Sequence, residues 1–292
     1  MPSTRDIRRR IRSVKSTAQI TKAMQMVASS KMRKAQEAAQ AGRPYAQLMT
    51  KVLGEVSHHA GDFRHPLMER REVKRRAVVI VSTDKGLCGA LNGNLLREAA
   101  KFDRQTTTFV VAGRKGAQFV ARTKRELAAE FTYRDTPGFA EARAISRFVR
   151  DLFLKGEVDA VDLLFTSFVS TLNQKPELFP FLPVGEIKGV KMDLAGAEMQ
   201  VELVKGATEF LFEPDASSVL GSLLPHYLNF VLFQVLLEAK ASEHSARMVA
   251  MKNATDNAQQ LVRDLTLDYN KLRQANITKE LLEIFSAAMA LE

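Results

Sequence analysis

The chain begins with apolar side chains that recur at helical spacing among polar ones. Four of these positions are separated by four, three and four residues: Ile7, Ile11, Val14 and Ala18. This spacing puts all four on one narrow face of an α-helix. Ser3 or Thr4 is a candidate cap for the start of the helix, and Pro44 is a candidate breaker within it. We therefore predict a first, helical region over residues 1–57.

The pattern changes in a second region, residues 74–213. Three compact runs of β-branched and apolar residues predict buried parallel strands at 77–82, 108–113 and 161–169. Helical patterns lie between and after them, at 89–102, 115–128 and 139–155. Alternating strands and helices indicate an α/β layer with right-handed crossovers. Beyond Ser170, strand-like runs such as FPFLPVGEI and MQVELV indicate an antiparallel edge or extension of the sheet.

A third region, residues 217–292, is one long helical pattern. Pro225 suits a first helical turn with Ser222 as its cap, and neither proline nor glycine follows before Met289. A helix of about 65 residues is ~100 Å long, whereas a compact globule of this chain length has a radius of gyration of ~19 Å. The helix is therefore expected to project, and its apolar seam needs a covering partner.

The N-terminal helix is the only other segment of comparable length and pattern. Because the α/β region separates the two helices in the sequence, they most simply meet as an antiparallel pair. The predicted fold class is therefore α/β, with a long antiparallel coiled coil of the N- and C-terminal helices and an inserted Rossmann-like α/β domain.

Positive charge is concentrated in the first 45 residues. Eleven Lys and Arg residues stand there against two acids, which gives +9 of the formal net charge of +10. A solvated face, a nucleic acid and an acidic protein surface are all open explanations. Residues 1–40 contain no aromatic side chain for base stacking, whereas Met24, Met26 and Met32 suit a contact surface that accepts several geometries. The methionines favour a protein partner.

Candidate chemical sites are few. The stretch GLCGALNG at 86–93 matches neither G-x-G-x-x-G nor a Walker A loop, so we interpret it as a tight strand-to-helix turn. The five histidines show no metal-binding spacing, and Glu243 and His244 lie mid-helix, where polar packing explains them. Cys88 is the single cysteine, which excludes an internal disulfide and suits a small buried thiol. We predict no catalytic residue, cofactor or metal.

Membrane and targeting signals are weak. The most apolar run, LNFVLFQVLL at 228–237, is about half the ~20 residues that a membrane helix needs. The Arg-rich start resembles a transit peptide, but the helical pattern continues past the usual length of one. We therefore expect neither a membrane span nor a targeting segment.

Four stretches together resemble the γ subunit of F-type ATP synthases, of the bacterial type. They are ITKAMQMVASSKMRKAQ at 20–36, DKGLCGALN at 84–92, SEHSARMVAMKNATDNA at 242–258 and YNKLRQANITKELLEI at 269–284. The resemblance runs from end to end and implies the coiled-coil fold derived above. It implies a non-catalytic central shaft that couples proton flow through the membrane to ATP synthesis at three catalytic β subunits. The implied partners are the ring of α and β subunits, the ε subunit and the c-ring, and not nucleic acid. The implied location is the cytoplasmic face of the bacterial inner membrane.

The resemblance also implies contacts with loops of the β subunit at five positions: Met24, Arg247, Arg273, Gln274 and Thr278. Met24 matches a methionine that faces an acidic β loop, and Arg273 with Gln274 matches a polar pair that meets a catch loop. Arg247 matches a shaft arginine implicated in coupling. Two departures from the family are Ala90 and Ala287, which stand where relatives commonly have glycine.

Two other functions stay open when the residues are considered alone. One is a nucleotide-binding α/β enzyme with helical appendages, which would use the stretch GLCGALNG and would bind ATP or NAD tightly. The other is a basic coiled-coil adaptor on nucleic acid, which would bind duplex DNA with a strong salt dependence.

Overall fold

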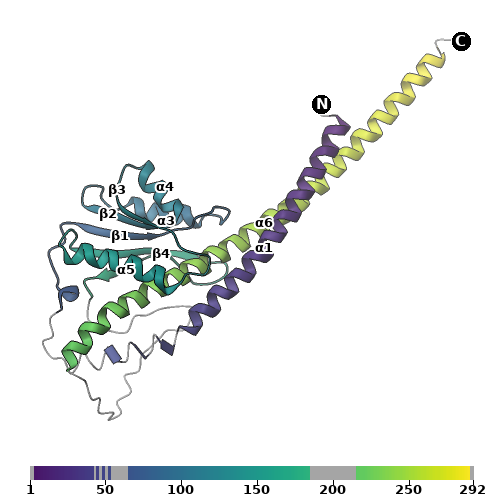
Figure 1. Cartoon of the computed structure of the whole chain (residues 1–292). Coiled ribbons are helices and arrows are strands. Elements are labelled where there is room, and N and C mark those ends of the chain that lie inside the picture. The colour runs from purple at the N-terminus through teal and green to yellow at the C-terminus, as the bar shows by residue number, and fades with distance from the viewer. Residues whose placement is uncertain are drawn as a thin grey trace. The chain divides into compact units, whose positions relative to one another are not determined.

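A computed structural model gives the fold of the chain (Figure 1). The structure describes residues 3–42, 44–45, 48–49, 52–53, 65–184 and 215–289. The chain divides into two compact units, Met1–Val27 with Met248–Glu292, and Ala28–Arg247. Two long helices, α1 (Thr4–Ala41) and α6 (Ala216–Met289), each contribute to both units.

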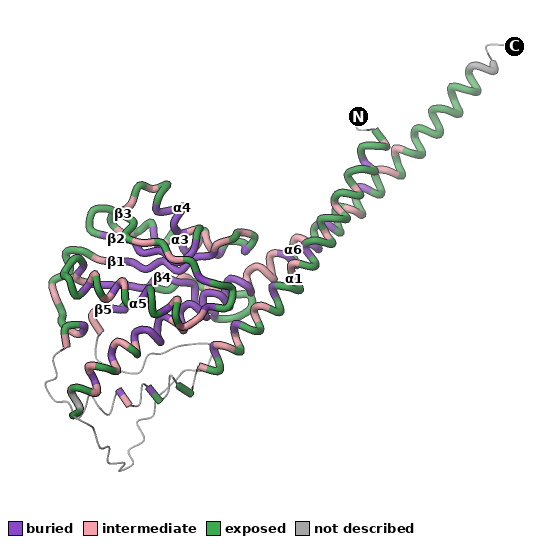
Figure 2. The backbone as a smooth tube through the Cα atoms, in the orientation of Figure 1, coloured by how far each residue is buried: buried purple, intermediate pink, exposed green. Residues whose placement is uncertain are grey.

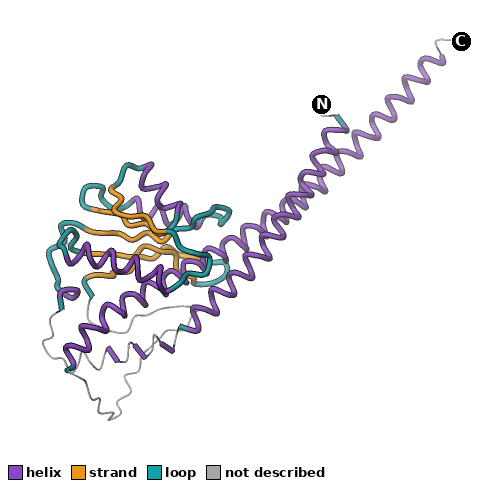
Figure 3. The backbone as a smooth tube through the Cα atoms, viewed as in Figure 1, coloured by secondary structure: helices purple, strands orange, loops and turns teal. Residues whose placement is uncertain are grey.

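In the first unit, α1 and α6 lie side by side and run in opposite directions (Figure 3). The hydroxyls of Thr21 and Thr255 are hydrogen-bonded at 2.7 Å, and the Arg8 guanidinium donates to the Tyr269 hydroxyl. A step towards the N-terminus on α1 therefore corresponds to a step towards the C-terminus on α6. The predicted antiparallel pairing of the terminal helices is confirmed.

Ser3, one of the two candidate caps in the sequence, caps α1. The Ser3 hydroxyl accepts a hydrogen bond from the Asp6 N–H at 3.2 Å, and the Asp6 carboxylate accepts one from the Ser3 N–H at 3.4 Å. These bonds hold the pKa of Asp6 below its usual value. The helix ends at Ala41, so Pro44 lies beyond its last turn and does not kink it. Residues 44–45, 48–49 and 52–53 are also helical.

The second unit contains a five-stranded sheet in the order β3-β2-β1-β4-β5. The strands are β1 (Arg76–Val81), β2 (Thr107–Ala112), β3 (Glu126–Phe131), β4 (Ala160–Phe168) and β5 (Gln174–Leu182). The first four are parallel, and β5 pairs antiparallel with β4. The three predicted parallel strands and the predicted antiparallel edge are confirmed.

Strand β3 corrects the sequence prediction, which placed residues 115–128 in one helix. Helix α4 (Arg114–Arg122) ends earlier, and Lys124 then turns the chain with a φ of +52°. The sequence ELAAEF has good helix formers, but it pairs with β2 at the edge of the sheet. Hydrogen bonding to a neighbouring strand therefore outweighs local helix propensity here.

Helices cover both faces of the sheet, and its three central strands, β2, β1 and β4, are almost entirely buried (Figure 2). On one face, α3 (Leu91–Ala100) and α4 pack through Leu95 and Val120 against Phe109 of β2. On the other face, α5 (Phe139–Leu154) and α6 pack through Ile145 and Leu232 onto the sheet. A short 3-10 helix at Pro66–Met68 precedes β1. Helices α3 and α5 match their predicted ranges within about two residues.

The start of α6 also corrects a prediction. The helix begins at Ala216, nine residues before Pro225, and the Asp215 carboxylate accepts a hydrogen bond from the Ser218 N–H at 2.8 Å. Pro225 therefore lies inside the helix, where its missing N–H removes one backbone bond. Leu220 and Leu224, which are both buried, precede it on the same apolar face. Their burial offsets the cost of the proline.

By length and composition alone, helix α6 is long and apolar enough to cross a membrane. Its most apolar 18-residue window has a mean hydropathy of 1.5, but 61% of that window is buried within the chain. A core helix of a folded domain gives the same result.

The predicted run MQVELV, at residues 199–204, lies outside the described residues.

Candidate functional site: a charged junction between the long helices and the sheet

The centre of α6 carries charged residues where a buried helix normally has apolar ones. Every residue from 234 to 245 is buried, and this run includes Glu238, Lys240, Glu243 and His244. A buried charge is costly unless it is paired and hydrogen-bonded. The partners of these residues therefore show what holds α6 in place.

Five side chains form a row of alternating charge, which we call the charged junction: Lys31, Asp135, Lys240, Glu243 and Arg247. Lys31 of α1 is ion-paired with Asp135, which follows β3. Lys240 lies 3.9 Å from Asp135 and 3.0 Å from Glu243, and Glu243 lies 2.7 Å from Arg247. The row therefore joins α1, the sheet and α6 within the second unit.

Two members of the row, Arg247 and Lys240, also contact residues that follow strands of the sheet. The Arg247 guanidinium donates to the carbonyls of Lys85 and Gly86, at 3.4 and 3.3 Å, in the turn after β1. The Lys240 ammonium lies 4.4 Å from the centre of the Tyr133 ring, a cation–π contact. The Tyr133 hydroxyl in turn donates to the Ser82 carbonyl at 2.9 Å. The junction thus meets the carboxyl ends of β1 and β3.

A second set of bonds fixes α6 to β4. The Glu238 carboxylate accepts from the Ser167 hydroxyl at 2.6 Å and from the Phe168 N–H at 3.1 Å. Because Glu238 lies about two and a half turns from Arg247 on the same helix, α6 is held at separate points along its length. Such a helix resists both sliding and turning against the sheet.

The electrostatic environment agrees with a tightly packed junction. The hydrogen bond from Lys31 holds the pKa of Asp135 below its usual value. Burial lowers the pKa of His244 to about 4, so this imidazole is neutral near pH 7. The Arg247 guanidinium lies 3.3 Å from His244 Nδ1, while His244 Nε2 has no partner among the residues that the structure describes.

The turn GLCGALNG lies beneath Arg247, at the carboxyl end of β1. Open α/β sheets commonly bind nucleotides at this edge. Here the Arg247 side chain of α6 is hydrogen-bonded to backbone carbonyls of the turn. Leu87 and Gly89 have the positive φ values of a tight turn, 63° and 60°. Burial raises the pKa of the Cys88 thiol, which makes it a weaker nucleophile. The interpretation as a structural turn is favoured.

The structure separates the five predicted contact residues into two groups. Arg273, Gln274 and Thr278 are exposed on the last part of α6, and Met24 is half-buried on α1, all in the first unit. Arg247 belongs to the second unit, and its side chain is only 12% exposed. It therefore contacts its own chain within the second unit.

Sequence reasoning missed Asp135 and Lys240 as members of a site. The signal that could have identified them is the run of charged residues inside an otherwise apolar stretch of α6. The sequence analysis considered only two residues of this run, Glu243 and His244, and interpreted them as polar packing. That interpretation is confirmed. Among the described residues, no group of three or more His, Cys, Asp or Glu side chains has the geometry to hold a metal ion.

Comparison with known proteins identifies the family. A family model described as ATP synthase matches residues 3–291. The ATP synthase gamma chain of Opitutus terrae is 48% identical, covering 99% of each chain, and that of Methylacidiphilum infernorum is 45% identical, covering 100% of each. The chain belongs to the ATP synthase gamma family. The resemblance found in the sequence is confirmed over the full length.

Solved structures agree with this membership of the gamma family. A chain of the central stalk and c-ring structure of the Tetrahymena thermophila mitochondrial ATP synthase has a TM-score of 0.61 at 25% identity, covering 80% of this chain and 99% of that one. A rotor chain from Euglena gracilis has a TM-score of 0.66 at 19% identity, covering 94% and 98%. The second likeness supports the fold alone. The predicted fold class of a coiled coil with an α/β insertion is confirmed.

Proposed function

We propose that this chain is the central rotor of an ATP synthase and that its charged junction carries torque between the α/β domain and the shaft. The observation that carries the proposal is the full-length match to gamma chains together with α6, an unbroken helix of 74 residues. As a gamma subunit the chain is not itself catalytic. Its partners are the α and β subunits, the ε subunit and the c-ring.

The exposed end of α6 supports a shaft enclosed by partner subunits. Five large apolar side chains there are between 48% and 71% exposed in the chain alone: Ile277, Leu281, Leu282, Ile284 and Phe285. Contiguous exposed apolar surface of this kind marks an interaction site. An asymmetric shaft inside a threefold ring stabilises a different conformation in each of three identical subunits, and rotation exchanges those states.

We assign contacts with β-subunit loops to Met24, Arg273, Gln274 and Thr278. The last three are polar and exposed on α6, and electrostatic attraction is long-ranged enough to pass between equivalent partners. Arg247 was expected in the same role. Its bonds to Glu243, Lys85 and Gly86 favour a different one, in which it fixes α6 to the sheet.

The charged junction suits torque transfer because its bonds cross between elements. Rotation driven at the membrane must pass from the α/β domain into the long helices. Dispersion contacts between smooth apolar faces resist slip only weakly, whereas directional charged hydrogen bonds fix one register. The row from Lys31 to Arg247 holds both long helices against the sheet with such bonds.

Coupling measurements test the contact assignment. Arg273→Glu is compared with Arg263→Glu, an exposed arginine of the same helix, in synthase reconstituted into vesicles. We expect Arg273→Glu to lower the number of protons pumped per ATP hydrolysed while its melting temperature stays that of the parent. Equal coupling in the two variants would remove the assignment.

We also place the subunit on the cytoplasmic face of a bacterial inner membrane, attached through the membrane sector. The bacterial gamma chains that match it support this location. Inverted membrane vesicles should expose the chain to added trypsin, and right-side-out vesicles should protect it. Cleavage in both preparations would contradict the location.

A further inference from the structure

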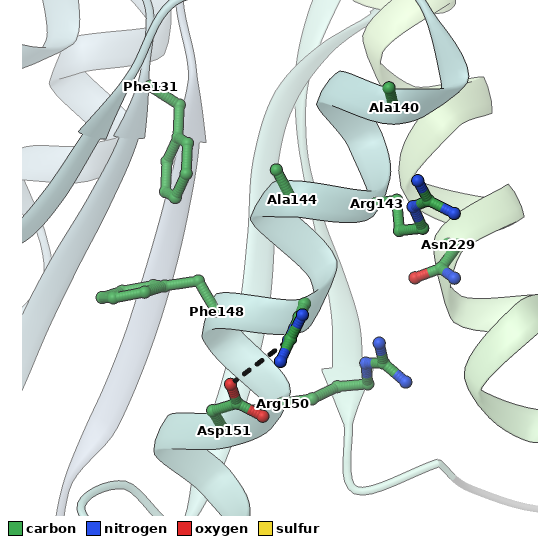
Figure 4. A pocket seen from close by; sticks show the side chains of 9 residues that line it. Phe131, Ala140, Arg143, Ala144, Phe148, Arg150, Asp151 and Asn229 are labelled. Carbon is green, nitrogen blue, oxygen red and sulfur yellow. Dashed lines mark ion pairs between the residues drawn. The ribbon is translucent and has the colours of Figure 1, made fainter.

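A cleft of about 620 Å³ follows the outer face of α5 in the second unit (Figure 4). Helix α5 provides most of its lining, β3 provides Phe131 and α6 provides Asn229. The lining residues are Phe131, Ala140, Arg143, Ala144, Arg147, Phe148, Arg150, Asp151 and Asn229. None of them belongs to the charged junction or to the predicted β-subunit contacts.

The cleft is positively charged. It has three arginines and one acid, and that acid, Asp151, already pairs with Arg147 at 4.0 Å. Arg150 donates through Nε to the Ser146 carbonyl at 3.3 Å. Within the described part of the chain, neither Arg143 nor Arg150 has a carboxylate at ion-pair distance. Two guanidinium groups are thus available to an anionic partner.

Asn229 provides a second, independent observation. Its side chain is only 6% exposed, and its Oδ1 atom is buried without a hydrogen-bond partner among the described residues. Figure 4 shows the amide facing α5 beside Arg143. A buried acceptor without a donor is costly, so its presence here indicates that something else provides an N–H or O–H group.

The opposite side of the cleft is apolar. The Phe131 and Phe148 rings lie edge to face with their centres 5.7 Å apart, and Figure 4 places both on the side of α5 away from Asn229. Ala140 and Ala144 lie between the two sides on exposed turns of α5. Their small side chains allow another backbone to approach the helix closely.

We propose that this cleft binds an acidic polypeptide segment of another subunit of the synthase. The three parts of the cleft suit carboxylates for the arginines, an N–H or O–H donor for Asn229 and an apolar side chain for the phenylalanines. One polypeptide segment provides all three, whereas a free phosphate provides negative charge and an O–H donor but no apolar group for the phenylalanines. The inference rests on the proposed function only in that the chain works inside the assembled complex.

Photocrosslinking in the purified, assembled synthase tests this inference. A chain with Ala144→p-benzoylphenylalanine is compared with one carrying the same probe at Gln118, an exposed residue of α4 on the other face of the sheet. After irradiation, the adduct is digested and sequenced by mass spectrometry. We expect the probe at Ala144 to join this chain to a segment of another subunit that contains several Asp or Glu residues.

Charge reversal then distinguishes a specific site from general attraction to a basic protein. Arg143→Glu with Arg150→Glu should lower the yield of the adduct by about tenfold or more. The matched pair Arg97→Glu with Arg122→Glu, on α3 and α4, should change it by less than about twofold. Adducts formed only with lipid or within this chain itself would overturn the inference. A crosslinked segment without Asp or Glu would also overturn it, as would an equal loss of adduct yield in the two charge-reversed pairs. Co-purification is checked first, because absence of the chain from the complex would overturn the proposed function as well.

Discussion

Removal of the Glu243 carboxylate tests whether the charged junction holds α6 in place. Glu243 lies between two cations, 3.0 Å from Lys240 and 2.7 Å from Arg247, and its side chain is 4% exposed. Glu243→Gln keeps the shape but leaves two largely buried cations without their shared counter-charge. Breaking a buried pair in this way costs about 3–5 kcal/mol of unfolding free energy.

The cost should be visible in thermal unfolding. For a domain of this size, 1 kcal/mol corresponds to roughly 2–4 °C in melting temperature, so Glu243→Gln should melt roughly 6–20 °C below the parent. Differential scanning calorimetry of the isolated chain at pH 7 measures this directly. The control is Glu98→Gln, which removes an exposed ion pair with Lys101 and should cost less than about 1 kcal/mol.

A triple variant separates loss of charge balance from loss of packing. Lys240→Met with Glu243→Leu and Arg247→Met removes all three charges together, and such replacements are often neutral or stabilising. We expect its stability to return close to that of the parent. A melting temperature of Glu243→Gln within about 2 °C of the parent would refute the reasoning, because it would mean that water or another group screens the two cations.

Three further predictions concern His244, Gly113 and Gly93. His244 has its pKa lowered from 6.5 to about 4 by burial. As the pH falls from about 6.5 to 4, His244 is therefore protonated in the unfolded chain but stays neutral in the folded chain. The unfolding free energy should drop by about 3 kcal/mol across that window, and His244→Asn should remove this dependence in urea titrations at a series of pH values. Gly113 has a φ of +103°, and a Cβ there would lie 2.2 Å from the Ser82 carbonyl oxygen. Gly113→Ala should therefore destabilise the chain by more than about 2 kcal/mol. A Cβ at Gly93 of α3 would meet no atom within 4 Å apart from the adjacent backbone of its own helix, so Gly93→Ala should stabilise the chain by about 0.5–1 kcal/mol. The opposite order of the two glycine variants in urea unfolding would contradict both statements.

The sequence predicted those elements whose pattern is local. Strands β1, β2 and β4 are short runs of β-branched and apolar residues buried on both faces, and this pattern is typical of parallel strands. Helix α1 has its own cap at Ser3 and its own apolar face. The pairing of the terminal helices also followed from length, because a long amphipathic helix needs a partner of comparable length.

Sequence motifs also nominated candidate contact residues, but they could not distinguish the environments of these residues. Arg247 and Arg273 both appear as basic residues in matched stretches of one helix. Only the structure shows that Arg247 is almost enclosed by its own chain while Arg273 is exposed. Exposure depends on what packs against a helix, and that information lies in other segments of the chain.

The tertiary structure alone decided the features that require residues from distant segments to meet. The sequence ELAAEF became a strand because β2 offered it an unpaired edge, and α6 continued through Pro225 because Leu220 and Leu224 gained a buried face. The charged junction likewise joins Lys31 to Asp135, which are 104 residues apart. Periodicity records only which side of an element is apolar. The energy of a buried charge depends on the partner it meets, and only the folded chain determines that partner.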